Sequence, residues 1–521
     1  MSNYYKFFLL VLLLNIPKFI KLLGHENYFR GDAAFYFLQA RSLIVDHSFF
    51  LVGQAVGKVG AVGDFMHGAG WYYIFLVPFQ LFGGDPFAGK FFMFCVSFAI
   101  GLYGYTVLKS YFGNKAGLFG LVFFSVSPYL ISSVNNLLSP YVVPLIMIFY
   151  LHYFLKYLRS KKTWCLYIMA AALGSIIHFD IACFGFIFPS FVFLIAYLFF
   201  KREITFLPII KVVLTISFFF LPHLIYDILN SFPNFHGLLN SFVKNSGTKM
   251  EYDIKFILEN RYELFKANQY NTFPSLTRSE MIPLLLFLCY GSLLMLRDRN
   301  LDKRKRKFIL FIISTIFSTW IVIIVFPTRL ASFWWITALI PFNIFWAAIV
   351  FSYCLENKHA INKLLTVLLL FVAFNSFSHQ FIEQLKTEKL LINIRYPISS
   401  QEPIEYIYHD SRDSEFKILY ASGLSLEYQY LLWYVGKSKY QNSLGFKNLD
   451  LRHIHKDQTY RHINREKQFE AFKKGIYYVL IDDGNNKEHH YYSRRAIESI
   501  GKLVWSKRFS NGDFLEKRVV E

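Results

Sequence analysis

Long apolar blocks separated by short polar turns run through the first 380 residues of the chain. A helix needs about 20 mostly apolar residues to cross a bilayer, and most of these blocks approach that length. The first block, Phe7–Gly24, has no small-residue cleavage pattern before His25, so we interpret it as a retained span. Lys18 and Lys21, in its outer half, are expected to snorkel to the interface. Further spans are predicted at Phe91–Leu108, Ala116–Ile131, Tyr141–Leu155, Trp164–Ile177, Ile181–Phe200, Val212–Ile225, Ile282–Leu296, Phe308–Phe326, Leu330–Leu355 and Leu364–Phe377.

The pattern therefore predicts an α-helical polytopic membrane protein of about 11 spans. Trp71–Phe82 is also apolar, but its length of about 12 residues is too short for a span. The positions of the basic clusters indicate whether it crosses the membrane. If it does not cross and the N-terminus is cytoplasmic, every basic cluster between spans lies on the cytoplasmic side, as the positive-inside rule requires. We therefore interpret it as an interfacial or re-entrant helix and expect the C-terminus outside. The clusters are Lys109 with Lys115, Arg159 with Lys161 and Lys162, Lys201 with Arg202, Arg297 through Lys307, and Lys358 with Lys363.

The chain after the last span, residues 381–521, is polar and has short alternating segments. They predict a small α/β extracytoplasmic domain that follows a transmembrane domain of residues 1–380 with a first outer loop at 25–90. Strands are expected at Phe416–Ala421 and Ile476–Ile481, helices at Tyr428–Val435 and Glu466–Lys474, and a hairpin of Leu503–Phe509 and Phe514–Val519 around Asn511-Gly512.

Composition supports a membrane protein, because 55% of the 521 residues are hydrophobic and the mean hydropathy is +0.34. A net charge of +20 would fit a nucleic-acid partner, but residues from 381 onward contribute only about +4 of it. The excess lies between the spans, so we expect no nucleic acid as partner. The five cysteines all lie in apolar segments, which excludes a disulfide framework and a cysteine-rich metal site.

Asp32, in the stretch RGDAAFYFLQA directly after the first span, is the leading candidate for chemistry. A carboxylate at the edge of a bilayer is costly to keep ionised, so it is seldom there for packing alone. The alternative is that Asp32 caps the helix predicted from Ala33 to Val45, and the two roles are compatible.

Residues 5 to 240 resemble the membrane-embedded GT-C glycosyltransferases, specifically the branch of protein O-mannosyltransferases and lipid A aminoarabinose transferases. The resemblance rests on the order and spacing of GDAAFYFLQARSL, HGAGWYYIFLVPFQLFGGDP, FSVSPYLISSVNNLLSP, HFDIACFGFIFPSF and FLPHLIYDILNSFPNF. It implies transfer of a sugar from a polyprenyl-phosphate carrier to a lipid, glycan or protein acceptor on the outer face of the bacterial cytoplasmic membrane. The family usually has two acidic residues together in the first loop; here Ala33 follows Asp32, and Asp64 is the candidate substitute.

Such a transfer needs a base for the acceptor proton and cationic or hydrogen-bonding groups near the leaving phosphate. Asp32 suits the first role, and one carboxylate without a partner predicts inversion at the anomeric carbon. Arg329, near Trp334 and Trp335 at the outer end of a span, suits the second, with a snorkelling interface anchor as its alternative.

Four further residues in the expected outer turns are candidate substrate contacts. His67 and His178 could contact phosphate, sugar or a metal ion, or act as structural hydrogen-bonding groups. Asp180 could pair with His178 or cap the next helix, and Asn135 could bind sugar or stabilise its turn. Members of the family differ in their use of a divalent metal ion, and no dense ligand cluster encodes one here.

Two other classes of protein compete with an enzyme. A transporter or flippase of lipid-linked sugars would carry charges within its spans and inverted repeats, whereas these spans are nearly free of charge. A non-catalytic envelope assembly protein would use the C-terminal domain and would not depend on Asp32.

Overall fold

The structure is a computed structural model. It describes residues 3–24, 29, 31–55, 66–237, 254–273, 278–325, 333–356, 360–387, 401–411, 416–420, 425–436, 475–481, 501–509 and 514–520. These residues divide into two compact units, and three of the chain's segments make up each unit. The first consists of Met1–Glu26, Ser48–Pro78 and Gly89–Leu390, and the second of Asn27–His47, Phe79–Ala88 and Leu391–Glu521.

The first predicted span is two helices, α1 (Asn3–Leu14) and α2 (Ile16–Leu23), interrupted at Asn15. Pro17 lies in the first turn of α2, where its missing N–H costs nothing. Lys18 is fully buried, and its Nζ donates to the carbonyl oxygens of Ser97 (3.2 Å) and Phe124 (3.4 Å). The expected snorkelling of Lys18 is therefore wrong, because the ammonium group finds backbone acceptors inside the bundle.

A helix is present in each of the other segments predicted to span the membrane. They are α5 (Phe87–Phe112), α6 (Asn114–Val126) with α7 (Pro128–Ser132), α8 (Val143–Ser160), α9 (Trp164–Ser175), α10 (Ile181–Phe200), α11 (Phe206–Leu229), α14 (Arg278–Arg297), α15 (Lys303–Val325), α16 (Leu339–Glu356) and α17 (Ala360–Thr387). Among the described residues, six helices are long and apolar enough to cross a membrane, or up to seven if α6 and α7, bent by 50°, form one span. The chain is thus a multi-pass integral membrane protein, and a total of about 11 spans stays a prediction.

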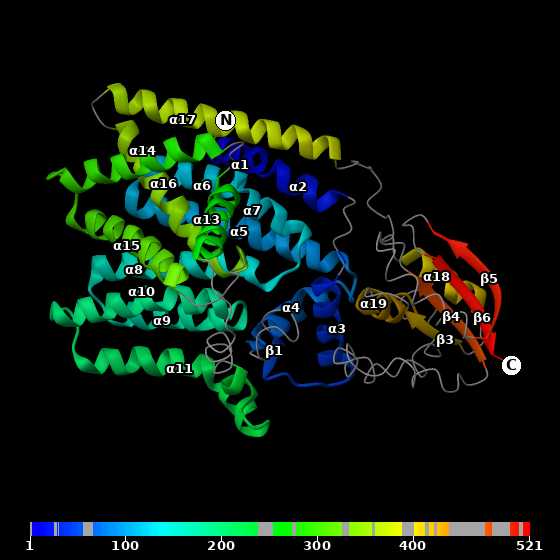
Figure 1. The fold of residues 1–521 in the computed structure, drawn as a ribbon. Helices are drawn as coiled ribbons and strands as arrows, with labels where there is room; N and C mark the ends of the chain where they lie inside the picture. The colour runs from blue at the N-terminus through cyan, green and yellow to red at the C-terminus, as the bar shows by residue number, and fades with distance from the viewer. Residues whose placement is uncertain are drawn as a thin grey trace. The chain divides into compact units, whose positions relative to one another are not determined.

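The helices α8, α9, α10 and α11 lie side by side in the first unit (Figure 1). α16 is the most buried of the long helices and packs against α6, α14, α15 and α17. The short α4 (Gly70–Leu81) has 12 residues, which agrees with the short helix expected there.

A polar helix, α13 (Ile254–Thr272), lies between the predicted spans Val212–Ile225 and Ile282–Leu296. It packs against α7, α15 and α16, and buries polar side chains that include Arg261 and Asn268. Asn268 donates to the carbonyl oxygen of Ile336 in the 3-10 helix η4 (Phe333–Ile336), at 3.2 Å, and accepts a hydrogen bond from Asn343, at 2.9 Å. Hydrogen bonds of this kind make a polar helix compatible with a buried position.

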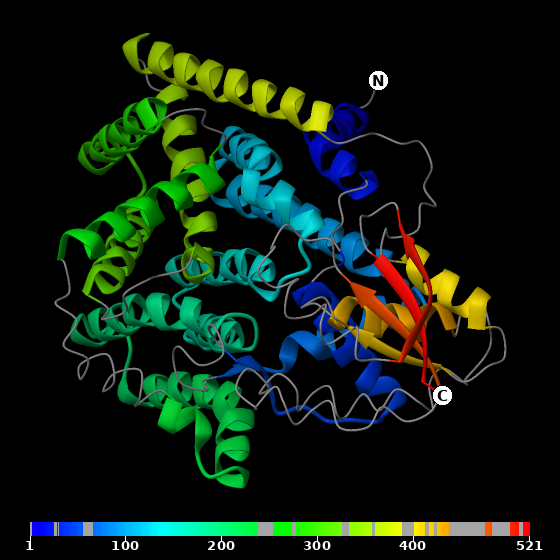
Figure 2. The same ribbon diagram turned by 45° about the vertical axis from the view of Figure 1, so that its right-hand side comes forward.

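The second unit contains α3 (Asp32–Val45), α18 (Gln401–Ser411), α19 (Ser425–Val435) and a four-stranded sheet, which Figure 2 shows beside α18. The strands β3 (Phe416–Tyr420), β4 (Gly475–Ile481), β5 (Lys502–Arg508) and β6 (Phe514–Val520) are arranged in the order β3-β4-β6-β5. β3 and β4 are parallel, and the other pairs are antiparallel. The predicted strands, hairpin strands and helix at Tyr428–Val435 are confirmed. The helix predicted at Glu466–Lys474 and the turn Asn511-Gly512 lie outside the described residues.

Candidate functional site

A short hairpin in the first unit, β1 (Val52–Ala55) and β2 (Met66–Gly68), carries the first predicted histidine. Two side chains near the end of α11 (Phe206–Leu229) form hydrogen bonds with the backbone of β2. The Met66 N–H donates to Asn234 Oδ1 at 2.8 Å, and His223 Nε2 lies 3.2 Å from the Met66 carbonyl oxygen. Since a carbonyl oxygen only accepts, His223 Nε2 carries the proton in this contact.

Asp227, one turn after His223 on α11, organises the reverse turn that positions Asn234. Its buried carboxylate accepts hydrogen bonds from the N–H groups of Asn234 (2.9 Å) and Phe235 (3.2 Å). Ser231 and Phe232 in this turn have positive φ angles of 63° and 58°, a conformation that needs such support in residues with a Cβ.

His178 lies against bare backbone in the HGAG segment. A Cβ added to Gly68 would be 2.0 Å from His178 Nδ1, and one added to Gly70 would be 2.8 Å from His178 Cβ. Only glycine permits this approach. His178 Nδ1 has no hydrogen-bond partner among the described residues, and the His178 and His223 ring centroids are 6.2 Å apart.

His67 completes what we call the histidine cluster: His67, His178 and His223. Its Nδ1 lies 3.3 Å from the Ile181 N–H at the start of α10 and accepts a hydrogen bond from it. Burial, with a smaller contribution from nearby His223, lowers the pKa of His67 to about 4. His67 is therefore neutral at physiological pH and acts through hydrogen bonds rather than charge.

Asp180 is the N-cap of α10. Its Oδ1 accepts from the N–H groups of Ala182 (3.0 Å) and Cys183 (3.2 Å), so the capping alternative for this residue is confirmed. Burial raises its pKa to about 7, although both hydrogen bonds favour the carboxylate. Within the described parts of the chain, no group of three or more His, Cys, Asp or Glu side chains could hold a metal ion.

Asn135 is buried in the 3-10 helix η1 (Ser133–Asn135) of the predicted outer turn. Its neighbour Asn136 donates to the carbonyl oxygen of Ser132 at 2.9 Å, a hydrogen bond within the turn. Ser139 joins this segment to the turn that carries His178, because its hydroxyl donates to the carbonyl oxygen of the next residue, Phe179, at 2.7 Å. The structure thus brings the turn at Asn135 and the turn at His178 together.

Asp32 lies in the second unit, as the first residue of α3, with an exposed side chain. The N-cap position belongs to Gly31, whose φ of +49° favours glycine, so Asp32 is not the capping residue. A carboxylate in the first turn interacts favourably with the helix dipole. Ala33, at the place of the family's second acidic residue, is buried. Asp64 and Arg329 lie outside the described residues.

The helix that carries Asp32 is anchored by α19 from the C-terminal part of the chain. Tyr430 packs edge-on against Phe37 of α3, with ring centroids 5.0 Å apart, and its hydroxyl donates to the Gly84 carbonyl oxygen. The Arg41 guanidinium lies 5.7 Å from the ring centroid of Trp433. α19 therefore fixes α3 through aromatic side chains.

Three residues of this arrangement are absent from the candidates drawn from the sequence: His223, Asp227 and Asn234. The stretch FLPHLIYDILNSFPNF contains all of them and contributed to the family resemblance. His223 and Asp227 are four residues apart and therefore share one helix face, which is the signal that could have identified them.

Several solved structures are similar to this one. ArnT from Cupriavidus metallidurans bound to undecaprenyl phosphate has a TM-score of 0.59 and 11% identity over 100% of this chain and 99% of that chain. The apo form of the same protein also has a TM-score of 0.59 and 11% identity, over 99% of both chains. A third similar structure is the archaeal oligosaccharyltransferase AglB from Archaeoglobus fulgidus, in complex with an inhibitory peptide and a dolichol-phosphate. Its TM-score is 0.48 and its sequence identity 12%, over 99% of this chain and 74% of that one. No protein-family model and no curated protein matches the sequence. The chain therefore has the fold of ArnT, a GT-C glycosyltransferase, which confirms the fold that the sequence resemblance implied.

Proposed function

We propose that this protein is a membrane glycosyltransferase that moves a sugar from a polyprenyl-phosphate donor to an acceptor on the non-cytoplasmic face. The observation that carries the proposal is the fold shared with ArnT over nearly the full length of both chains. That ArnT structure holds undecaprenyl phosphate, a ligand of the donor class proposed here. The spans nearly free of charge fit an enzyme that works at the interface better than a flippase.

In the proposed reaction an acceptor oxygen or nitrogen attacks the anomeric carbon and the bond from that carbon to the phosphate oxygen breaks. Asp32 takes the proton of the acceptor, and polyprenyl phosphate leaves with the bonding electrons. Asp32 lies in the first turn of α3, at the helix end where a carboxylate interacts favourably with the dipole.

The residues proposed to bind the donor fall into a charged one for the phosphate and neutral ones for the sugar. Arg329 would stabilise the leaving phosphate, since a guanidinium forms paired hydrogen bonds to phosphate oxygens. The histidine cluster and Asn135 would face the sugar, because neutral polar groups suit hydroxyl recognition better than phosphate recognition. Asp180 would act indirectly, by fixing the start of α10 where His67 is bound.

Inversion follows from the same assignment. A retaining double displacement needs a second carboxylate as nucleophile, about 5 Å from the first. The adjacent position is the buried Ala33, and phosphate is already a good leaving group. We therefore propose a single displacement, with Asp64 as the residue to test next if Asp32 proves dispensable.

The proposed orientation places the N-terminus in the cytoplasm and the C-terminus outside, because all basic clusters then lie inside. A fused reporter that is active only in the cytoplasm should give no signal after Glu521. The same reporter placed in the turn after Arg202 should be active. The reverse pattern would refute this orientation.

The central experiment is Asp32→Asn in the purified full chain. Donors would be a panel of undecaprenyl-phosphate pentoses and hexoses, with a lipid extract as acceptor and release of undecaprenyl phosphate as the readout. The substitution keeps shape but removes the base, so turnover should fall by about 10²-fold or more while donor binding persists.

Asp46→Asn is the matched control, because it makes the same change at the other end of α3. Asp46 is exposed and forms an ion pair with the buried Arg41 at 2.8 Å; the asparagine oxygen can still accept this hydrogen bond, so we expect an effect within a few-fold. Near-normal transfer by Asp32→Asn would exclude Asp32 as the base. Absence of product with every donor in detergent, where flipping has no meaning, would favour a transporter.

A further inference from the structure

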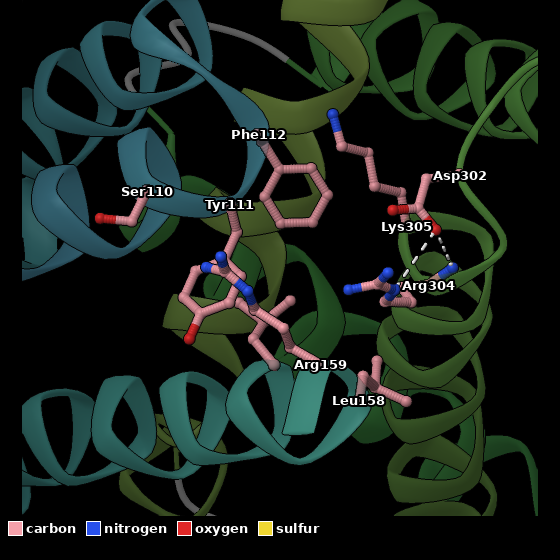
Figure 3. A pocket seen from close by; sticks show the side chains of 9 residues that line it. Ser110, Tyr111, Phe112, Leu158, Arg159, Asp302, Arg304 and Lys305 are labelled. Carbon is pink, nitrogen blue, oxygen red and sulfur yellow. Dashed lines mark hydrogen bonds and ion pairs between the residues drawn. The ribbon is translucent and has the colours of Figure 1, made fainter. Parts of the chain in front are cut away.

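A basic pocket of about 290 Å³ lies at one end of the first unit. We call it the basic pocket. It is formed by the C-terminal ends of α5 and α8 and the beginning of α15, and Figure 3 shows its side chains. Its lining residues are Ser110, Tyr111, Phe112, Leu155, Leu158, Arg159, Asp302, Arg304 and Lys305.

The charges in the basic pocket do not cancel. The single carboxylate, Asp302, is used by Arg304: its Oδ1 accepts from the Arg304 N–H at 2.8 Å and lies 3.8 Å from Arg304 Nε. Arg159 and Lys305 form no ion pair with any described residue. Lys305 Nζ lies 5.8 Å from the centroid of the Phe112 ring, and Figure 3 shows Arg159 extending toward Tyr111. Two cations therefore face the pocket without an anionic partner.

The basic pocket and His178 of the histidine cluster lie near opposite ends of α9. α8 ends at Ser160 beside the pocket, and α9 starts at Trp164 directly after the turn. From there the chain leads to His178, about 21 Å from Trp164 at 1.5 Å per residue. The basic pocket is therefore separate from the histidine cluster.

We propose that the basic pocket binds the phosphate headgroup of an anionic phospholipid. Basic pockets between spanning helices at the positively charged face of a membrane protein recognise such headgroups. Arg159 supplies a guanidinium fork for phosphate oxygens and Lys305 a second positive charge. Phe112, Leu155 and Leu158 give the pocket an apolar wall for the glycerol and upper acyl region, which a free phosphate ion would not need.

The experiment is a native mass-spectrometry titration of the full-length protein in neutral detergent. Phosphatidylglycerol, phosphatidylcholine with the same acyl chains, and inorganic phosphate would be the ligands. Phosphatidylglycerol should bind about tenfold more tightly than phosphatidylcholine, since charge-assisted hydrogen bonds to its phosphate are not opposed by a choline cation. Inorganic phosphate at millimolar concentration should not displace it.

Arg159→Ala with Lys305→Ala should weaken phosphatidylglycerol binding about tenfold. Lys201→Ala is the matched control, because it removes a positive charge from the same end of the bundle, after α10, outside the pocket. It should change affinity less than about twofold. Arg159→Lys, which keeps the charge but loses the fork, should give an intermediate loss and tests the proposal if the double variant does not fold.

Three results would overturn the proposal. They are equal affinity for both lipids, equal weakening by Lys201→Ala, and displacement by inorganic phosphate alone. The first two would mean that charge at this face acts without a specific site. The third would mean that the pocket takes a free ion.

Discussion

The two ends of the spanning-helix unit use polar residues in different ways. At one end, side chains of the histidine cluster form hydrogen bonds with backbone groups: His67 accepts from the Ile181 N–H, and His223 contacts the Met66 carbonyl oxygen. At the other end, cations gather in the basic pocket and on its surroundings, where Glu203 pairs with both Lys161 and Lys307. Hydrogen bonds to the backbone therefore organise the first end, and ion pairs and positive charges with no ion-pair partner among the described residues characterise the second.

This difference indicates how each end responds to change. Directed contacts with bare glycine backbone are lost when an atom is added, because the packed neighbours cannot move far. Exposed charges tolerate substitution, because water replaces their partners and salt screens them. The histidine end should therefore be sensitive to single atoms and the basic end to net charge.

The largest effect is expected for Gly68→Ala. The added methyl would overlap His178 Nδ1, so the ring must move and transfer should fall by about 10²-fold, as for a misplacement of about 1 Å. Gly185→Ala in α10 is the control, because a Cβ there meets nothing within 4 Å. Turnover of both purified variants would be measured. Equal activities would contradict the claim that the glycine contact matters.

Asp227→Ala should have the next largest effect. It leaves the N–H groups of Asn234 and Phe235 without their acceptor, which should cost about 1–3 kcal/mol of stability. The thermal midpoint in detergent reports this loss. Asp298→Ala, at the basic end, loses hydrogen bonds from the Tyr353 hydroxyl and the Asn300 N–H. It should shift the midpoint less, because the Asn300 N–H is exposed and water can replace its acceptor. A smaller shift for Asp227→Ala than for Asp298→Ala would remove the contrast between the two ends.

The stability contributed by Asp180, at the histidine end, should depend on pH. The pKa of Asp180 is raised from its ordinary value of 3.8 to about 7 by burial, so the folded state binds this proton more tightly than the unfolded state. Its contribution to stability is complete below about pH 4 and is lost as the pH rises through 7. The thermal midpoint of the wild type should fall over this window more than that of Asp180→Asn. Parallel pH profiles would mean that the Asp180 carboxyl is not protonated as expected.

The smallest effect on transfer is expected for Arg159→Ala. The residue lies in the basic pocket at the far end of α8, so turnover in detergent should stay within about twofold of the wild type. The measurement is the same undecaprenyl-phosphate release. A loss of tenfold or more would show that the two ends are coupled.

Much of the secondary structure could be predicted from the sequence. The apolar block at Ile181–Phe200 coincides with α10, and the short block near Trp71 is the 12-residue α4. Strands β3 and β4 follow the predicted apolar runs. Local hydrophobicity determines these elements, because each must bury an apolar face or meet lipid whatever its neighbours are.

The candidate site was predicted only in part. His67 and His178 were identified as candidates from the turns in which they lie. The cluster also depends on His223 and on Asn234, which was not identified and which accepts a hydrogen bond from Met66, 168 positions away in the chain. The role of Asp180 also had two alternatives until its hydrogen bonds to Ala182 and Cys183 were known. Contacts over such separations leave no periodic signal in the sequence.

What the sequence determined by itself is therefore the set of helices and strands, the excess of basic residues between the apolar blocks, and the resemblance that gives the fold class. The tertiary structure alone decided that Lys18 is buried on carbonyl oxygens, that glycines at 68 and 70 receive His178, and that α19 anchors α3. It also brought three helix ends together into the basic pocket. The physical reason is that hydrophobicity specifies which face of a helix is buried, whereas side-chain packing specifies which helix ends meet.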